Sequence, residues 1–161
     1  MRFGYFDDAN REYVVEKADT PMSWINYLGT SEYASLISNN AAGYSFYRSP
    51  RLGRLMRMRF NSVPMERPGK YIYIRDEADG EFWSASWQPV GKPLDQYHTE
   101  CRHGMGYTRF ISEYKGIKSN YLVFVPVDKP LEFWEIELEN ASSEIRNLSL
   151  FSYAEYCLWN N

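Results

Sequence analysis

The stretch that decides the fold is YTRFISEYKGIKSNYLVFV, residues 107–125. Its two runs rich in apolar and β-branched residues, Tyr107–Tyr114 and Ser119–Val125, flank the pair Lys115-Gly116. A glycine-containing pair between two such runs is typical of the turn that joins neighbouring antiparallel strands. We therefore predict two strands here, separated by a turn.

Similar runs occur on both sides of this stretch. We predict further strands at Phe133–Glu139 and Ile145–Tyr153 downstream, and at Glu12–Val15, Tyr44–Tyr47, Leu55–Phe60, Tyr71–Arg75 and Phe82–Ser84 upstream. Residues 32–37 fit either a strand or one helical turn, and no helix of three full turns is predicted. One strand with its turn takes about ten to twelve residues, which is the spacing of an antiparallel β-sandwich.

Length and composition narrow the class of protein. The chain has 161 residues, of which 44% are hydrophobic and 24% charged, as in one globular domain. Aromatic residues reach 17%, which favours strands and also fits carbohydrate binding. The net charge of −3 argues against a nucleic-acid partner. No apolar run reaches the roughly eighteen residues that span a membrane.

The N-terminal residues Met1-Arg2-Phe3-Gly4 do not resemble a signal peptide, so we expect a cytoplasmic protein. In that compartment Cys101 and Cys157 are expected to be free thiols. The C-terminal residues 151–161 are apolar and alternating, whereas natural ends are usually polar. We therefore expect the sequence to be part of a longer protein.

Residues 38–48, SNNAAGYSFYR, combine amides, a glycine and aromatic rings, and four arginines follow: Arg51, Arg54, Arg57 and Arg59. Aromatic faces beside hydrogen-bond donors suit a sugar, and guanidinium groups suit a phosphate or carboxylate. By strand alternation Arg57 and Arg59 share one face. The simpler interpretation is a β-hairpin whose arginines are solvated.

Chemistry-bearing groups elsewhere are sparse. His98, Cys101 and His103 lie close in sequence, but there is no second His/Cys cluster to complete a tetrahedral metal site. We expect a glycine-shaped corner here, with His103 in a local hydrogen bond. The acidic pairs Asp7/Asp8 and Asp76/Glu77 lie in polar turns, where neighbouring carboxylates are usually solvated rather than opposed across a substrate. No nucleophile motif occurs, so these residues predict neither a metal nor a catalytic centre.

Ordered blocks along nearly the whole chain resemble the N-terminal domain of the inverting disaccharide phosphorylases of glycoside hydrolase family ninety-four, the cellobiose and chitobiose phosphorylases. The blocks are Arg2–Asp8, Arg11–Val14, Trp24–Gly29, Ile37–Asn39, Gly43–Arg48, Phe82–Ser84, Trp87–Val90, Cys101–Gly104, Phe124–Pro126, Leu150–Tyr153 and Cys157–Asn160. Cys157–Asn160 is similar to the cellobiose and laminaribiose branch, whereas Arg67–Tyr71 and Ser84–Val90 are similar to the chitobiose branch. Ala42 stands where the family usually has glycine, so the sugar specificity stays open.

The resemblance implies an all-β fold, an antiparallel sandwich of the galactose-mutarotase-like type, with residues 1–161 as an incomplete N-terminal domain. The full enzymes add a helical linker, an (α/α) barrel and a C-terminal β domain. They cleave a β-linked disaccharide reversibly with phosphate, giving an α-sugar 1-phosphate and a free sugar. Phosphate is the nucleophile and no cofactor is needed, so one carboxylic acid serves as general acid. The resemblance places that aspartate beyond Asn161.

This domain is therefore expected to be non-catalytic, to support a homodimer and to form part of the active-site wall. Asn160 is the expected substrate contact, and Arg48, Arg54 and Arg57 are expected at the pocket rim or the dimer interface. The alternative is a stand-alone carbohydrate-binding module, which the aromatic content and the sandwich architecture also fit.

Overall fold

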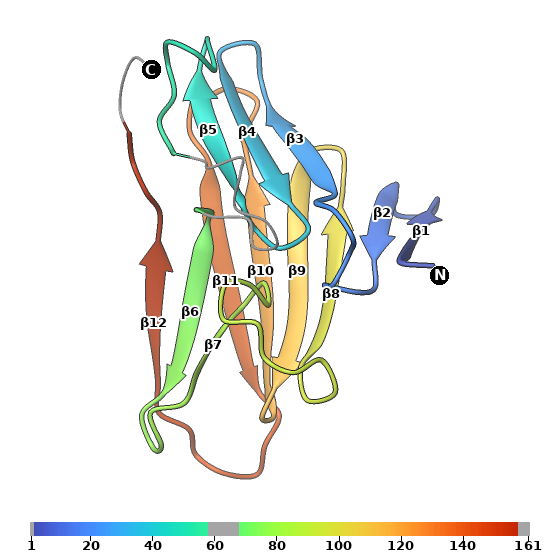
Figure 1. The fold of residues 1–161 in the computed structure, drawn as a ribbon, viewed down its shortest axis with the longest axis vertical. Helices are drawn as coiled ribbons and strands as arrows, with labels where there is room; N and C mark the ends of the chain where they lie inside the picture. Colours follow the sequence, from blue (N-terminus) through green and yellow to red (C-terminus); the bar gives the residue numbers. More distant parts are fainter. Residues whose placement is uncertain (1, 58–67, 158–161) are drawn as a thin grey trace.

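The computed structural model describes residues 2–57 and 68–157, which form twelve β-strands and no helix (Figure 1). The strands are β1 (Gly4–Asp7), β2 (Glu12–Val15), β3 (Ile25–Gly29), β4 (Tyr33–Ser38), β5 (Gly43–Tyr47), β6 (Tyr71–Asp76), β7 (Phe82–Ser84), β8 (His98–His103), β9 (Tyr107–Tyr114), β10 (Ile117–Phe124), β11 (Phe133–Asn140) and β12 (Leu148–Tyr153). All strand pairs are antiparallel. The predicted all-β, antiparallel class is confirmed.

The largest sheet has six strands in the order β1-β2-β8-β9-β10-β11. It contains the hairpin β9–β10, which turns through Lys115 and Gly116 with φ of 50° and 73°. Positive φ at both turn residues matches the right-handed twist of the flanking strands, and only glycine adopts it without strain. In both strands buried residues alternate with more accessible ones, so one face lies on the core.

The strands β12-β6-β7 form a second sheet and β3-β4-β5 a third. Figure 1 shows β12 and β6 to the left of β9 and β10, and β3–β5 at the upper end of these long strands. One apolar cluster joins the three sheets, with Trp83, Ile74, Ile37, Phe110 and Tyr121 among its fully buried members. The core is therefore shared by all three sheets.

The N-terminal strands are attached to the six-stranded sheet by a charge cluster around Arg102 on β8. Its guanidinium lies 2.8 Å from Glu12 and 3.4 Å from Asp7, and it also contacts Glu100. The Tyr107 hydroxyl donates a hydrogen bond to the other oxygen of Glu12. Hydrogen bonds from Arg102 and Tyr107 therefore help to fix the position of β1 and β2.

Two strand predictions need correction. The last strand begins at Leu148 rather than Ile145, because Asn140 and Ser142 bond to the carbonyl of Glu144 and prolong the turn. The predicted strand Leu55–Phe60 is wrong for its described part. Arg54 forms a single bridge with Phe46 of β5, after which Met56 pairs with Tyr156.

Residues 58–60 lie outside the described residues. Of the ambiguous residues 32–37, residues 33–37 lie in strand β4. The strands β1, β3 and β8 were not predicted.

Candidate functional site

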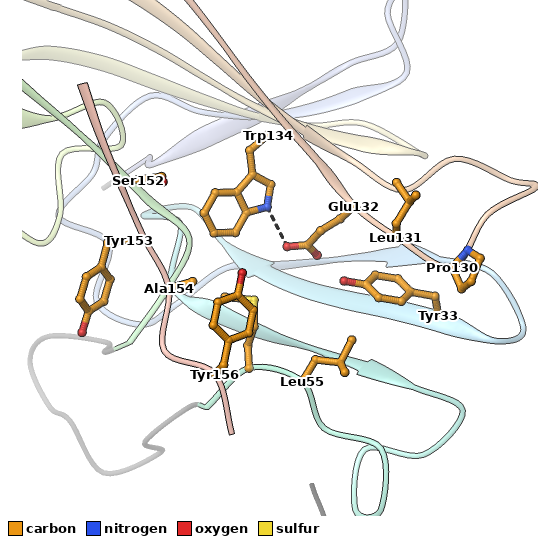
Figure 2. Close-up of a pocket in the computed structure, with 11 residues that line it drawn as sticks. Tyr33, Leu55, Pro130, Leu131, Glu132, Trp134, Ser152, Tyr153, Ala154 and Tyr156 are labelled. Carbon is orange, nitrogen blue, oxygen red and sulfur yellow. Dashed lines mark hydrogen bonds between the residues drawn. The ribbon is translucent and has the colours of Figure 1, made fainter. Parts of the chain in front are cut away.

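The pocket shown in Figure 2 has a volume of about 520 Å³ and lies where β4, β11 and the chain after β12 meet. Four of its lining residues are aromatic, namely Tyr33, Trp134, Tyr153 and Tyr156. Leu131 and Leu55 add aliphatic walls. A concave site with this lining can hold an apolar group or the apolar face of a ring.

Glu132 lines this pocket, and hydrogen-bond partners occupy both of its carboxylate oxygens. Its side chain is 8% exposed. One carboxylate oxygen accepts bonds from Lys70 Nζ at 2.9 Å and from the Trp134 indole at 2.7 Å, drawn in Figure 2. The other accepts from Lys70 at 2.8 Å and from the Ser45 hydroxyl at 2.7 Å. An ionised carboxylate offers about four acceptor positions, so none remains for a ligand hydroxyl.

Lys70, just before β6, is fully buried beneath Glu132. Its ammonium also lies 2.6 Å from Ser35 Oγ on β4 and 2.5 Å from Ser45 Oγ on β5. Burial lowers the pKa of Lys70, against the opposing effect of Glu132. Burial likewise opposes ionisation of Glu132, but the ammonium and the serine hydroxyls outweigh it and hold its pKa below the usual value. We call Lys70, Glu132, Ser35 and Ser45 the buried ion-pair cluster.

This cluster spans all three sheets, because its members come from β4 and β5, from the residue before β6 and from the segment before β11. The main chain of Lys70 adds two ties: its amide donates to Ala41 O, and its carbonyl accepts from the Tyr121 hydroxyl. Saturated hydrogen bonding and contacts to every layer indicate a structural role. Sequence inspection missed the cluster because Lys70 and Glu132 are 62 residues apart and lie in no recognisable motif.

The three arginines predicted at a rim lie along one short stretch but have different partners. Arg48 is exposed and bonds to Glu32 at 2.7 Å. Arg54 lies 4.7 Å from the centre of the Tyr44 ring and donates to the carbonyl of Pro50. Their described contacts therefore differ, an acidic side chain for Arg48 and an aromatic ring with a main-chain carbonyl for Arg54.

Arg57 is placed differently. Its guanidinium lies 4.0 Å from Glu155, and its amide donates to the carbonyl of Glu155 at 2.9 Å. The Cys157 amide in turn donates to Leu55 O at 3.0 Å. These bonds fix residues 155–157, which lead toward Asn160, and they place Arg57 next to Glu155. Asn160 itself and Arg59 lie outside the described residues.

His103 makes the expected local contact, with Nδ1 at 3.0 Å from Thr108 Oγ1 and Nε2 at 3.1 Å from Trp24 O. Burial lowers the pKa of His103 to about 4, so the imidazole is neutral near pH 7. Both cysteines are free thiols, and burial raises the pKa of Cys101. Within residues 2–57 and 68–157, no three His, Cys, Asp or Glu side chains form a metal site.

One carboxylate of each acidic pair is held by structural partners. Asp7 accepts bonds from Asn10 and Arg102, and Asp76 is paired with Arg146. Hydrogen bonds, from Asn10 to Asp7 and from the Ala78 amide to Asp76, lower the pKa of both carboxyl groups. They are ionised structural groups.

In the part of the chain that the structure describes, no helix could cross a membrane.

Comparison with known proteins gives the family. Residues 11–161 match the glycosyl hydrolase 94 supersandwich domain. The chain belongs to this family. The supersandwich description agrees with the three-sheet architecture, and the resemblance seen in the sequence blocks is confirmed.

Among relatives of this supersandwich domain, the chain is 48% identical over 97% of its length to N,N′-diacetylchitobiose phosphorylase of Vibrio furnissii. It is 45% identical, again over 97%, to the enzyme of that name from Vibrio proteolyticus. Solabiose phosphorylase of Paenibacillus borealis is 33% identical over 97% of the chain. The chain spans only 19%, 19% and 20% of these three proteins, about a fifth of their length.

Proposed function

We propose that this domain is the N-terminal part of a phosphorylase that cleaves N,N′-diacetylchitobiose. The observation that carries the proposal is the 48% identity, over nearly the whole domain, to an enzyme with that name. The domain is only 33% identical to the solabiose enzyme, so it is more similar to the diacetylchitobiose enzymes than to that one. This choice narrows the specificity that the sequence blocks left open.

The proposed reaction transfers a hexosyl group. A phosphate oxygen attacks the anomeric carbon as the bond to the bridging oxygen breaks, and that oxygen takes a proton from a carboxylic acid. The products are α-N-acetylglucosamine 1-phosphate and free N-acetylglucosamine. Phosphate is a substrate, and the reaction involves no cofactor and no change of redox state. The general acid is proposed to lie beyond Asn161.

Residues 1–161 are proposed as one non-catalytic, incomplete N-terminal domain of a cytoplasmic homodimer. Asn160 is its proposed substrate contact, and Arg48, Arg54 and Arg57 its proposed rim or interface residues. The bonds of Arg57 to Glu155 support a role in placing the chain that carries Asn160. The saturated carboxylate of Glu132 argues against a separate sugar site in the pocket of Figure 2.

The test is phosphate release by the full polypeptide that carries this domain. α-N-Acetylglucosamine 1-phosphate with N-acetylglucosamine is compared with α-glucose 1-phosphate with glucose. We expect release with the first pair at a rate at least about tenfold above the second, which corresponds to ~1.4 kcal/mol of discrimination. Equal rates, or activity with glucose alone, would refute the proposed specificity.

Substitutions in this domain test its contribution to binding of the acceptor sugar separately from the chemical step. Arg57→Ala is expected to raise KM for the acceptor sugar, because the segment before Asn160 loses an anchor. The matched control is Arg75→Ala, which removes a comparably exposed guanidinium whose partner is Glu77. An unchanged KM in Arg57→Ala would contradict the proposed placement. The alternative function, a stand-alone binding module, requires that the 161-residue chain alone binds chitobiose. Isothermal titration calorimetry measures this binding directly.

A further inference from the structure

An open cleft lies where β2, β3 and β8 meet, on the right of Figure 1. Its volume is about 390 Å³, within the range of about 300–1,000 Å³ that small-molecule sites occupy. It is lined by Tyr13, Trp24, Ile25, Asn26 and His103. Among these described residues only His103 can become cationic, and burial lowers the pKa of its imidazole to about 4. The cleft therefore suits an uncharged ligand.

Two braced aromatic rings form one wall of this cleft. The ring centroids of Tyr13 and Trp24 are 5.5 Å apart. Phe6 packs edge-on against Tyr13 at 4.8 Å, and Phe3 packs edge-on against Trp24 at 6.0 Å. Tyr13 and Trp24 are themselves only partly buried. Rings that are held in place and still accessible can pack against the apolar C–H face of a sugar.

Trp24 is fixed through its main chain, while its indole N–H stays free. The Trp24 amide donates to Asn39 Oδ1 at 3.0 Å. Its carbonyl accepts from the Asn39 amide at 2.8 Å and lies 3.1 Å from His103 Nε2. Within residues 2–57 and 68–157, neither the Trp24 indole nitrogen nor the Tyr13 hydroxyl has a hydrogen-bond partner, and neither atom is sealed from solvent. Both groups are thus available to a ligand.

Asn26 on β3 adds an acceptor. Its Nδ2 lies 2.9 Å from Gly104 O, 3.0 Å from Tyr107 O and 3.2 Å from Thr108 Oγ1. An amide nitrogen carries only two protons, so this nitrogen is fully used and the orientation of the amide is fixed. Its Oδ1 has no partner among the described residues and is open to solvent. The cleft therefore combines two rings with a free donor, a free acceptor and a hydroxyl that can act as either.

We propose that this cleft binds one uncharged pyranose unit, whose apolar face packs on Trp24 and Tyr13 and whose hydroxyl groups bond to Asn26 Oδ1, the indole N–H and the phenol. A phosphate or sugar phosphate is disfavoured, because no lysine or arginine is among the described lining residues. The ligand class comes from the cleft alone, so the inference goes beyond the proposed function and does not depend on it.

Photolabelling of the full polypeptide in phosphate-free buffer tests this. The probes are the β-glycosides of N-acetylglucosamine and of glucose, each with a diazirine on the aglycone. Trypsin cuts after Arg11, Lys17 and Arg48, so Tyr13 lies in peptide 12–17 and Trp24 lies in peptide 18–48. We expect at least one probe to label both peptides, with fragmentation assigning the label in the longer one to residues 24–26. The corresponding free sugar in excess should remove the label, and inorganic phosphate should not.

Two variants and a matched control assign the label to the cleft. Tyr13→Phe removes only a hydroxyl that has no partner in the described chain, so the fold is kept and labelling should fall about two- to tenfold. Trp24→Ala removes the main packing surface and should lower labelling of peptide 12–17 by about tenfold or more. Tyr27→Ala is the control, because Tyr27 lies on the same strand and is 65% exposed but does not line the cleft. It should leave the label unchanged.

Three outcomes overturn the proposal. They are the absence of label from both peptides with either probe, label that survives excess free sugar or is displaced by phosphate, and label that Tyr13→Phe does not lower. Labelling needs no turnover, so it is separable from the proposed function. A labelled cleft in a polypeptide without phosphorylase activity refutes the proposed function alone. An active phosphorylase whose cleft takes no label refutes this inference alone.

Discussion

Replacing Lys70 by methionine should strongly destabilise the chain, since it removes the ammonium while keeping a side chain of similar length. Glu132 would then be left with its side chain 8% exposed and without the cation that contacts both of its oxygens. Removing one partner of a buried ion pair costs about 3–5 kcal/mol. The control is Lys115→Met, whose partner Asp79 is 49% exposed and whose loss should cost about 0–1 kcal/mol.

The effect should depend on pH in a defined direction. In the parent chain the pKa of Glu132 is lowered, so its ionised form contributes stability above the unfolded pKa and loses it as pH falls. In Lys70→Met, burial without the ammonium should raise the pKa of Glu132. A buried carboxyl group with a raised pKa stabilises the folded state below its unfolded pKa. This stabilisation is lost as pH rises through the folded pKa. The difference in the free energy of unfolding between parent and variant should therefore become smaller as pH falls from about 7 to about 4.5.

Urea unfolding of the 161-residue chain, followed by tryptophan fluorescence at both pH values, measures this gap. The double variant Lys70→Met/Glu132→Met should recover most of the loss, because both charges are then absent from the buried site. A cost for Lys70→Met no greater than that for Lys115→Met would refute the reasoning. A gap that does not change with pH would refute its electrostatic part.

Four further predictions concern other parts of the fold. His103 should titrate near its lowered pKa of about 4 in an NMR titration, and the parent should lose stability relative to His103→Gln as pH falls from about 6.5 to about 4, because only the unfolded chain takes up the proton there. Gly43→Ala should cost about 3 kcal/mol or more in urea unfolding, since φ is 148° and its Cβ would lie 2.0 Å from a carbonyl oxygen. Gly91→Ala, with φ of 68° and nothing within 4 Å, should cost about 1 kcal/mol. Tyr97→Phe should cost about 1–3 kcal/mol by the same measurement, because its buried hydroxyl both donates and accepts a main-chain hydrogen bond.

Most of the fold could be predicted because local patterns determine it. Lys115-Gly116 defines the β9–β10 turn, and the strand period of two is visible in the flanking residues. The prediction failed at residues 55–57, the described part of the expected strand, where the pairing partner changes from β5 to the chain after β12. Such a change of partner depends on tertiary contacts that alternation does not encode.

The candidate site was less predictable than the fold. The arginines were visible in the sequence, but their partners Glu32 and Glu155 were not. The buried ion-pair cluster was missed entirely, since a lysine before an apolar run is usually solvated. Its ammonium is buried only because acceptors from three sheets converge on it, and that convergence is a property of the fold.

The attachment of β1 and β2 to β8 has a consequence for synthesis on the ribosome. Glu12 and its partner Arg102 are 90 residues apart, so at bacterial or eukaryotic elongation rates the hairpin β1–β2 waits about 5–18 s for its neighbouring strand. An isolated two-stranded hairpin is at best marginally stable, and Phe6 remains 77% exposed even in the finished sheet. The segment translated earlier is thus added to the sheet only after β8 has been made. A holding chaperone would find this domain most accessible while the nascent chain has passed β2 but has not yet reached β8.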